Sequence, residues 1–136
     1  MPVIIWINGG FGAGKTTLAQ ELHRRLPEAV VYDPEDVGIM LWKWMPPNGD
    51  FQHLPSWREL VVATALSLRR HHADTLIVPM SLIRDAYRAE ILGGLAGCIG
   101  LASTLSQEKS TFLGSGGFSS GIVQTSPQML ISSLRG

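Results

Sequence analysis

Residues 9–16 read Gly-Gly-Phe-Gly-Ala-Gly-Lys-Thr and fit the pattern G-x-x-x-x-G-K-S/T. Five apolar residues, 3–7, come directly before this motif and are rich in β-branched side chains, as in a strand buried on both faces. After the motif, apolar residues recur at helical spacing until Pro27 interrupts them. A buried strand, a glycine-rich loop and a helix in this order restrict the chain to an α/β fold.

The motif carries chemistry because its glycines allow successive backbone N–H groups to converge on phosphate oxygens. Lys15 adds a positive charge at the β- and γ-phosphates, so we expect it to be catalytic, and the Thr16 hydroxyl is placed to ligate Mg²⁺. We therefore interpret the motif as a P-loop that binds ATP and Mg²⁺, and not as a glycine-rich turn with a chance lysine. The residues expected to bind the nucleotide are Gly9, Gly10, Phe11, Gly12, Ala13, Gly14, Lys15, Thr16 and Thr17.

The rest of the first 96 residues alternates between strand and helix patterns, and a length of 136 residues suits one domain. Short apolar runs predict further strands at 29–32 and 75–80. Helical spacing predicts helices at 14–26, 34–44, 55–72 and 81–92, the last one capped by Ser81 and stopped by Gly93 and Gly94. This order predicts a P-loop NTPase-type three-layer α/β sandwich with a parallel sheet.

Charge and composition exclude several classes of protein. Eleven basic side chains balance eleven acidic ones, so the chain lacks the basic field that holds nucleic acid, and we expect no nucleic-acid partner. The apolar run at 3–7 is far too short to span a bilayer, and we see neither a signal peptide nor a membrane anchor. A single cysteine, Cys98, forms no internal disulfide. These features favour a cytoplasmic protein.

The last 40 residues differ from the rest. Residues 97–136 carry three of the 22 charged side chains, together with nine serines and seven glycines. Such a composition has little to bury and much backbone entropy to lose. We therefore predict a nucleotide-binding core at 1–96 and an irregular or divergent tail at 97–136, with at most one short strand near 98–102. Without further strands, the strand at 3–7 would lack one neighbour, which predicts a marginally stable, aggregation-prone protein.

Three acidic residues follow the predicted strand at 29–32. Asp33 is our first candidate for a catalytic, substrate-facing or Mg²⁺-linked acid, because ligands of open α/β sheets bind at this edge. The alternative for Asp33 is turn formation, since aspartate before proline often opens a turn. Glu35 and Asp36 fit the first turn of a helix, where the helix dipole favours acids, and Glu35 is also a candidate for binding substrate.

Two arginines are candidates for binding an anionic substrate. Arg58 lies at the start of a predicted helix, and Arg84 closely follows the predicted strand at 75–80. Arg88 fits a solvated helix face better. His71, His72 and Asp74 together suggest a metal site, but adjacent histidines at a helix end are usually solvated, and we favour the solvated interpretation.

Large side chains crowd the segment after the second strand, and they either fill the core or form the wall of a substrate cleft. Among them Trp57 is the most core-like. The group consists of Trp42, Trp44, Met45, Phe51 and Trp57.

The chain resembles the tunicamycin resistance protein family, a P-loop group similar to small-molecule kinases. The resemblance rests on the residues from Ile5 to Thr16 and covers about 3–96. It continues through 21–26, 31–35, 50–52, Trp57-Arg58 and 76–80. It implies an ATP-binding protein that gives resistance to a nucleoside antibiotic, with the nucleotide at residues 9–16 and Asp33 where kinase relatives place a substrate-facing acid.

After Gly97 the family pattern of a fourth strand, an arginine-rich lid and a fifth strand is not recognisable, and residues 101–103 stand where the fourth strand should end. We interpret this departure as a frameshift or truncation of the reading frame. Three functions therefore stay open. They are phosphoryl transfer to or ATP-dependent inactivation of a nucleoside-like antibiotic, ATP-dependent sequestration of the drug without catalysis, and an inactive remnant. The acceptor and the oligomeric state are left undetermined.

Overall fold

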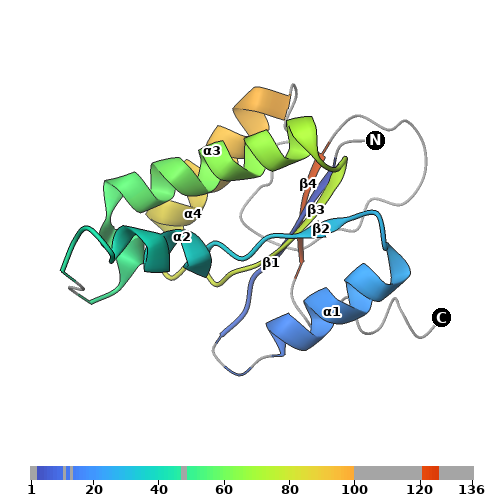
Figure 1. The fold of residues 1–136 in the computed structure, drawn as a ribbon, viewed down its shortest axis with the longest axis horizontal. Helices are drawn as coiled ribbons and strands as arrows, with labels where there is room; N and C mark the ends of the chain where they lie inside the picture. Colours follow the sequence, from blue (N-terminus) through green and yellow to red (C-terminus); the bar gives the residue numbers. More distant parts are fainter. Residues whose placement is uncertain (1–2, 11, 13, 47–48, 100–120, 126–136) are drawn as a thin grey trace.

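A computed structural model describes residues 3–10, 12, 14–46, 49–99 and 121–125. Its strands and helices alternate through the first 99 residues, as the sequence predicts (Figure 1). The elements are β1 (Val3–Ile7), α1 (Lys15–Arg25), β2 (Val30–Val31), α2 (Glu35–Leu41), the 3-10 turn η1 (Phe51–His53), α3 (Pro55–His71), β3 (Thr75–Pro79), α4 (Asp85–Ile99) and β4 (Gly121–Thr125).

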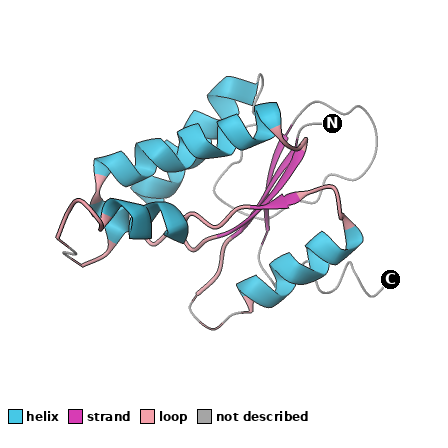
Figure 2. Ribbon diagram, viewed as in Figure 1, coloured by secondary structure: helices cyan, strands magenta, loops and turns pink. Residues whose placement is uncertain are grey.

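The four strands form one parallel sheet in the order β2-β3-β1-β4. In this sheet β1 pairs with β3 from Val3 opposite Thr75 to Ile7 opposite Pro79. The connections that leave β1, β2 and β3 therefore begin at the same edge of the sheet, where the strands have their carboxyl ends (Figure 2). In parallel α/β sheets this edge, at the carboxyl ends of the strands, is where ligands bind.

Helices cover both faces of the sheet, so the predicted three-layer α/β sandwich is confirmed. Helix α1 lies on one face, and α2, α3 and α4 lie on the other (Figure 1). The alternation of side chains along each strand matches this arrangement. On β1, Ile4 and Trp6 join the core beneath α3 and α4, whereas Ile7 packs with Leu18 and Leu22 of α1. Both faces being covered explains why the strands read as continuous apolar runs.

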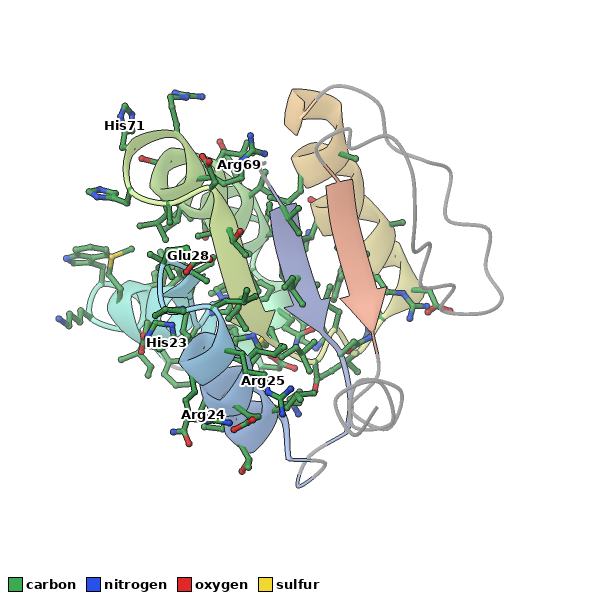
Figure 3. All side chains as sticks on the ribbon, turned by 90° about the vertical axis from the view of Figure 1, so that its right-hand side faces the viewer. His23, Arg24, Arg25, Glu28, Arg69 and His71 are labelled. Atoms are coloured by element: carbon green, nitrogen blue, oxygen red, sulfur yellow. The ribbon has the colours of Figure 1, made fainter. Side chains whose placement is uncertain are left out.

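Basic side chains gather at the end of α1. His23, Arg24 and Arg25 occupy its last turn, where positive charge suits the helix dipole, and all three are exposed (Figure 3). Hydrogen bonds from Arg24 and then Arg25 lower the pKa of Glu21 to about 2. This surface cluster faces solvent and lies apart from the glycine-rich loop.

The tail contributes a strand, which corrects our expectation for it. Strand β4 pairs in parallel with β1 along its whole length, from Val3 opposite Gly121 to Ile7 opposite Thr125. The prediction that β1 would lack a neighbour is therefore wrong, and the prediction of a marginally stable, aggregation-prone protein loses the premise on which it rested. The strand suggested near residues 98–102 is also wrong at Cys98 and Ile99, which end α4. Residues 100–120 of this tail lie outside the described residues.

The fourth helix differs from its prediction at both ends. It begins at Asp85, because Ser81 and Leu82 are bonded to the glycine-rich loop and do not open a helix. It also continues through Gly93 and Gly94 to Ile99. A Cβ atom on Gly94 would lie 3.3 Å from Val62 of α3, so this glycine permits close packing of two helices and does not stop one.

Two further elements, β2 and α2, are shorter than predicted. The second strand is limited to Val30 and Val31, and α2 ends at Leu41, with a turn where the prediction extended the helix to Trp44. Within the described residues, no helix is long and apolar enough to cross a membrane.

Candidate functional site

The loop that joins β1 to α1 takes a conformation that needs glycine. Gly12 and Gly14 have φ angles of 75° and 81°, in the left-handed region that other residues rarely adopt. A Cβ atom on either glycine would meet nothing within 4 Å, so the backbone angle and not crowding requires glycine here. Phe11 and Ala13, which we expect to bind nucleotide, lie outside the described residues.

Lys15 folds back over this loop. Its Nζ donates to the carbonyl oxygens of Gly9 and Gly10, at 2.9 Å each. The ammonium group therefore lies beside the loop, where a phosphate cradled by the loop would meet it.

The amino end of α1 is open to an anion. Its N-cap is Gly14, which offers no side-chain hydrogen bond to the first turn, and no acidic residue occupies that turn. The first N–H groups of the helix and its positive dipole end thus face the loop without a carboxylate of the protein nearby in sequence. Thr16 and Thr17 are exposed in this turn. These residues fit a phosphate chain, and the Thr16 hydroxyl fits an oxygen ligand of Mg²⁺.

The segment after β3 holds the start of the loop in place. Met80 N donates to Ile7 O at 3.1 Å, and Leu82 N donates to Asn8 Oδ1, also at 3.1 Å. Between them, the Ser81 hydroxyl donates to Gly9 O. The local pattern at Ser81 predicts a helix cap and does not reveal this role, because the contact joins residues 72 positions apart.

Gln52 anchors this segment from the other side. Its side chain is 3% exposed, and its Nε2 donates to Ser81 O at 2.8 Å while its Oε1 accepts from Ile83 N at 3.1 Å. The Asp50 carboxylate caps the turn by accepting from Gln52 N at 2.9 Å. A buried carboxamide with both ends bonded fixes the η1 turn against the segment after β3.

Asp33 lies between β2 and α2 at the same edge of the sheet. Its Oδ1 accepts from Glu35 N at 2.9 Å, and its carbonyl accepts from Asp36 N at 3.2 Å. The turn-forming alternative is therefore realised for at least one carboxylate oxygen. Glu35 is exposed in the first turn of α2. Burial raises the pKa of the neighbouring Tyr32 phenol, whose hydroxyl donates to Val61 O, so this phenol stays neutral at physiological pH.

Arg58 and Arg84 meet at Tyr87. Arg58 lies 4.3 Å from the centre of the Tyr87 ring, and Arg84 lies 5.6 Å from it. The Arg58 side chain is 12% exposed and pairs with Glu90 at 2.8 Å, so its charge is largely neutralised. Arg84 is exposed.

Two contacts around Tyr87 and Arg58 do not follow from the sequence. His53 Nδ1 lies 2.9 Å from the Tyr87 hydroxyl, and this contact brings η1 against α4. The Arg58 guanidinium also donates through Nη1 to Gln52 O at 2.8 Å. Arg88 pairs with Asp85 on the same helix, in keeping with the surface role expected for it.

The large side chains after β2 differ in burial, and the structure assigns one of the two open roles, core packing, to Trp57. Trp57 is fully buried, its Nε1 donates to Pro34 O at 2.9 Å, and its ring lies 5.1 Å from that of Phe51. Phe51 in turn meets Trp42 at 5.6 Å. Trp44 is 71% exposed. Core packing is thus confirmed for Trp57.

Gly38 of α2 allows Phe51 to reach this cluster. A Cβ atom at Gly38 would come within 2.5 Å of the Phe51 ring, so a larger residue there would push the ring away.

The described residues contain no group of three or more His, Cys, Asp or Glu side chains that could hold a metal ion. His71 and His72 are exposed. His71 and Arg69 lie near the amino ends of the strands, away from the glycine-rich loop (Figure 3).

The described architecture defines the class of protein. A parallel sheet between helical layers, whose first strand leads through a glycine-rich loop into the first helix, is the P-loop NTPase-type α/β fold that the sequence predicts.

A solved structure carries this further. The chain is similar to the tunicamycin resistance protein of Deinococcus radiodurans, with 41% sequence identity and a TM-score of 0.65. The match covers 71% of this chain, in agreement with residues 3–96, and the resemblance to the tunicamycin resistance protein is confirmed. The chain spans 57% of the length of that protein. No family model and no curated protein matches the chain.

Proposed function

We propose that this protein binds ATP at residues 9–16 and transfers a phosphoryl group to a nucleoside-like antibiotic, or inactivates it in another ATP-dependent step. The observation that carries the proposal is the loop itself. Two glycines in the left-handed region, an ammonium group laid along the loop and a helix end without a capping side chain converge on one place. The name of the similar Deinococcus protein supports an antibiotic as acceptor.

In this proposal the residues of the loop and some of the other candidates have separate roles. Backbone N–H groups of the loop and of Thr16 and Thr17 bind the phosphates, and Lys15 stabilises negative charge on the β- and γ-phosphates. Mg²⁺, when bound through Thr16, neutralises phosphate oxygens. Arg84 binds and orients the acceptor.

In the transfer step, an acceptor hydroxyl oxygen forms a bond to the γ-phosphorus. The bond from the γ-phosphorus to the bridging oxygen of ADP breaks, and Asp33 receives the hydroxyl proton. The products are ADP and phosphorylated acceptor.

The direct experiment incubates the purified protein with ATP, Mg²⁺ and tunicamycin and follows both products. We expect ADP and a phosphorylated drug in equal amounts, detected by chromatography and mass spectrometry. Binding of both ligands with neither product would overturn phosphoryl transfer and favour a protein that sequesters the drug. The turn bond at Asp33 and the neutralised Arg58 are the observations that favour this second function.

Replacing Asp33 by asparagine separates catalysis from turn formation. Asparagine keeps an oxygen for Glu35 N, so we expect stability to change by less than about 0.5 kcal/mol. It cannot take a proton, so we expect turnover to fall by ~10²–10⁴ while ATP affinity is kept.

The matched control is Glu28→Gln, which removes one exposed charge shortly before β2, at a residue with no proposed role. We expect this variant to keep its turnover, measured as ADP release. A loss of stability and of activity in parallel in Asp33→Asn would show that Asp33 only forms the turn.

A further inference from the structure

The carbonyl oxygen of Gly9 receives two hydrogen bonds from side chains. One comes from Lys15 Nζ at 2.9 Å, and the other comes from the hydroxyl of Ser81. Gly9 is the first residue of the loop motif, so its position sets where the loop starts. Two donors on this one oxygen thus link the loop to the segment that follows β3.

Ser81 is held firmly enough to fix that oxygen. Its own carbonyl accepts from the buried Gln52 side chain at 2.8 Å. The next residue, Leu82, donates its N–H to Asn8 Oδ1 at 3.1 Å, directly before Gly9. The backbone that carries the serine is therefore held from two sides, and neither of these bonds involves the lysine.

Lys15 has to change partners when a nucleotide binds. Its ammonium group has three N–H donors and bonds the carbonyls of Gly9 and Gly10, so it can bond a β- and a γ-phosphate oxygen together only by giving up one of these carbonyls. A part-buried carbonyl that loses its donor costs free energy. The Gly9 carbonyl avoids this loss if another donor stays in place.

We propose that Ser81 is a positioning residue for nucleotide binding: it keeps the Gly9 carbonyl bonded and so frees the Lys15 ammonium for the phosphates. This inference rests on the proposed binding of ATP to the loop. It assigns a role in shaping the phosphate site to the segment after β3, whose residues 80–84 include no acidic side chain.

The test measures MgATP affinity by equilibrium dialysis in Ser81→Ala, Ser81→Thr and the wild type. We expect Ser81→Ala to weaken ATP binding about fivefold, the fold-change that one net hydrogen bond represents. Ser81→Thr keeps the hydroxyl and should bind nearly as the wild type does. Ser67→Ala, on the exposed face of α3, is the matched control and should bind unchanged.

A double-mutant cycle separates this role from a general effect on the fold. In a Lys15→Ala background no ammonium leaves Gly9, so we expect Ser81→Ala to change ATP affinity by less than about twofold. Equal weakening in both backgrounds, or unchanged affinity of folded Ser81→Ala in the presence of Lys15, overturns the inference alone. Absence of ATP binding by the wild type overturns the proposed function and this inference with it.

Discussion

Lys15→Ala should lower ATP affinity by about 10- to 150-fold, which corresponds to about 1.5–3 kcal/mol for a charge-assisted hydrogen bond. The lysine is the sole cationic side chain of the motif, and its Nζ already lies within 2.9 Å of two loop carbonyls. Because the other donors to the phosphates are backbone N–H groups, no neighbouring side chain of residues 9–16 replaces the charge. Isothermal titration with MgATP measures the change.

The matched control for this prediction is Lys43→Ala. Lys43 is exposed in the turn after α2, so its removal changes the net charge equally and leaves the loop intact. We expect wild-type ATP affinity for Lys43→Ala and wild-type thermal stability for both variants. Equal ATP affinities of the two variants would show that the loop is not the nucleotide site.

The strands and helices of the first 96 residues could be predicted because their sequence patterns are local. A strand covered on both faces is a nearly continuous apolar run, as β1 is and as β3 is after Thr75. A helix that covers one face of a sheet repeats its apolar residues every 3.6 positions, as α1 and α3 do. The loop before α1 was equally visible, because a left-handed backbone at Gly12 and Gly14 restricts the residue type.

The parts that the sequence concealed depend on contacts between distant residues. Strand β4 is short and stands in a serine- and glycine-rich tail, and its partner β1 lies more than a hundred residues earlier. The helix signal at Gly94 failed because its missing side chain serves packing against Val62 and not termination. A local sequence pattern reflects the backbone preference of the residues themselves. The strand β4 and the helix at Gly94 depend instead on contacts with residues far away in the sequence.

The same reason explains the polar residues that were missed around the loop. Gln52 and Ser81 are 29 residues apart, and Ser81 and Gly9 are 72 apart, so no spacing rule connects them. A buried glutamine whose carboxamide bonds two backbone groups is recognised only once the η1 turn and the segment after β3 are in contact. The ion pair between Arg58 and Glu90 likewise joins α3 to α4 and follows from no local pattern.

Trp57→Ala should destabilise the protein by about 3–5 kcal/mol, the cost of deleting a fully buried aromatic side chain. The substitution removes the contact with Phe51 and leaves Pro34 O without the indole N–H that it accepts at 2.9 Å. Pro34 directly follows Asp33, so the loss loosens the turn that places this acid. Urea denaturation followed by circular dichroism measures the free energy of unfolding.

Trp44→Ala is the matched control for this prediction. Trp44 is 71% exposed, and its loss should lower the free energy of unfolding by less than about 0.5 kcal/mol. Equal destabilisation by the two substitutions would contradict the assignment of Trp57 to the core beneath α3.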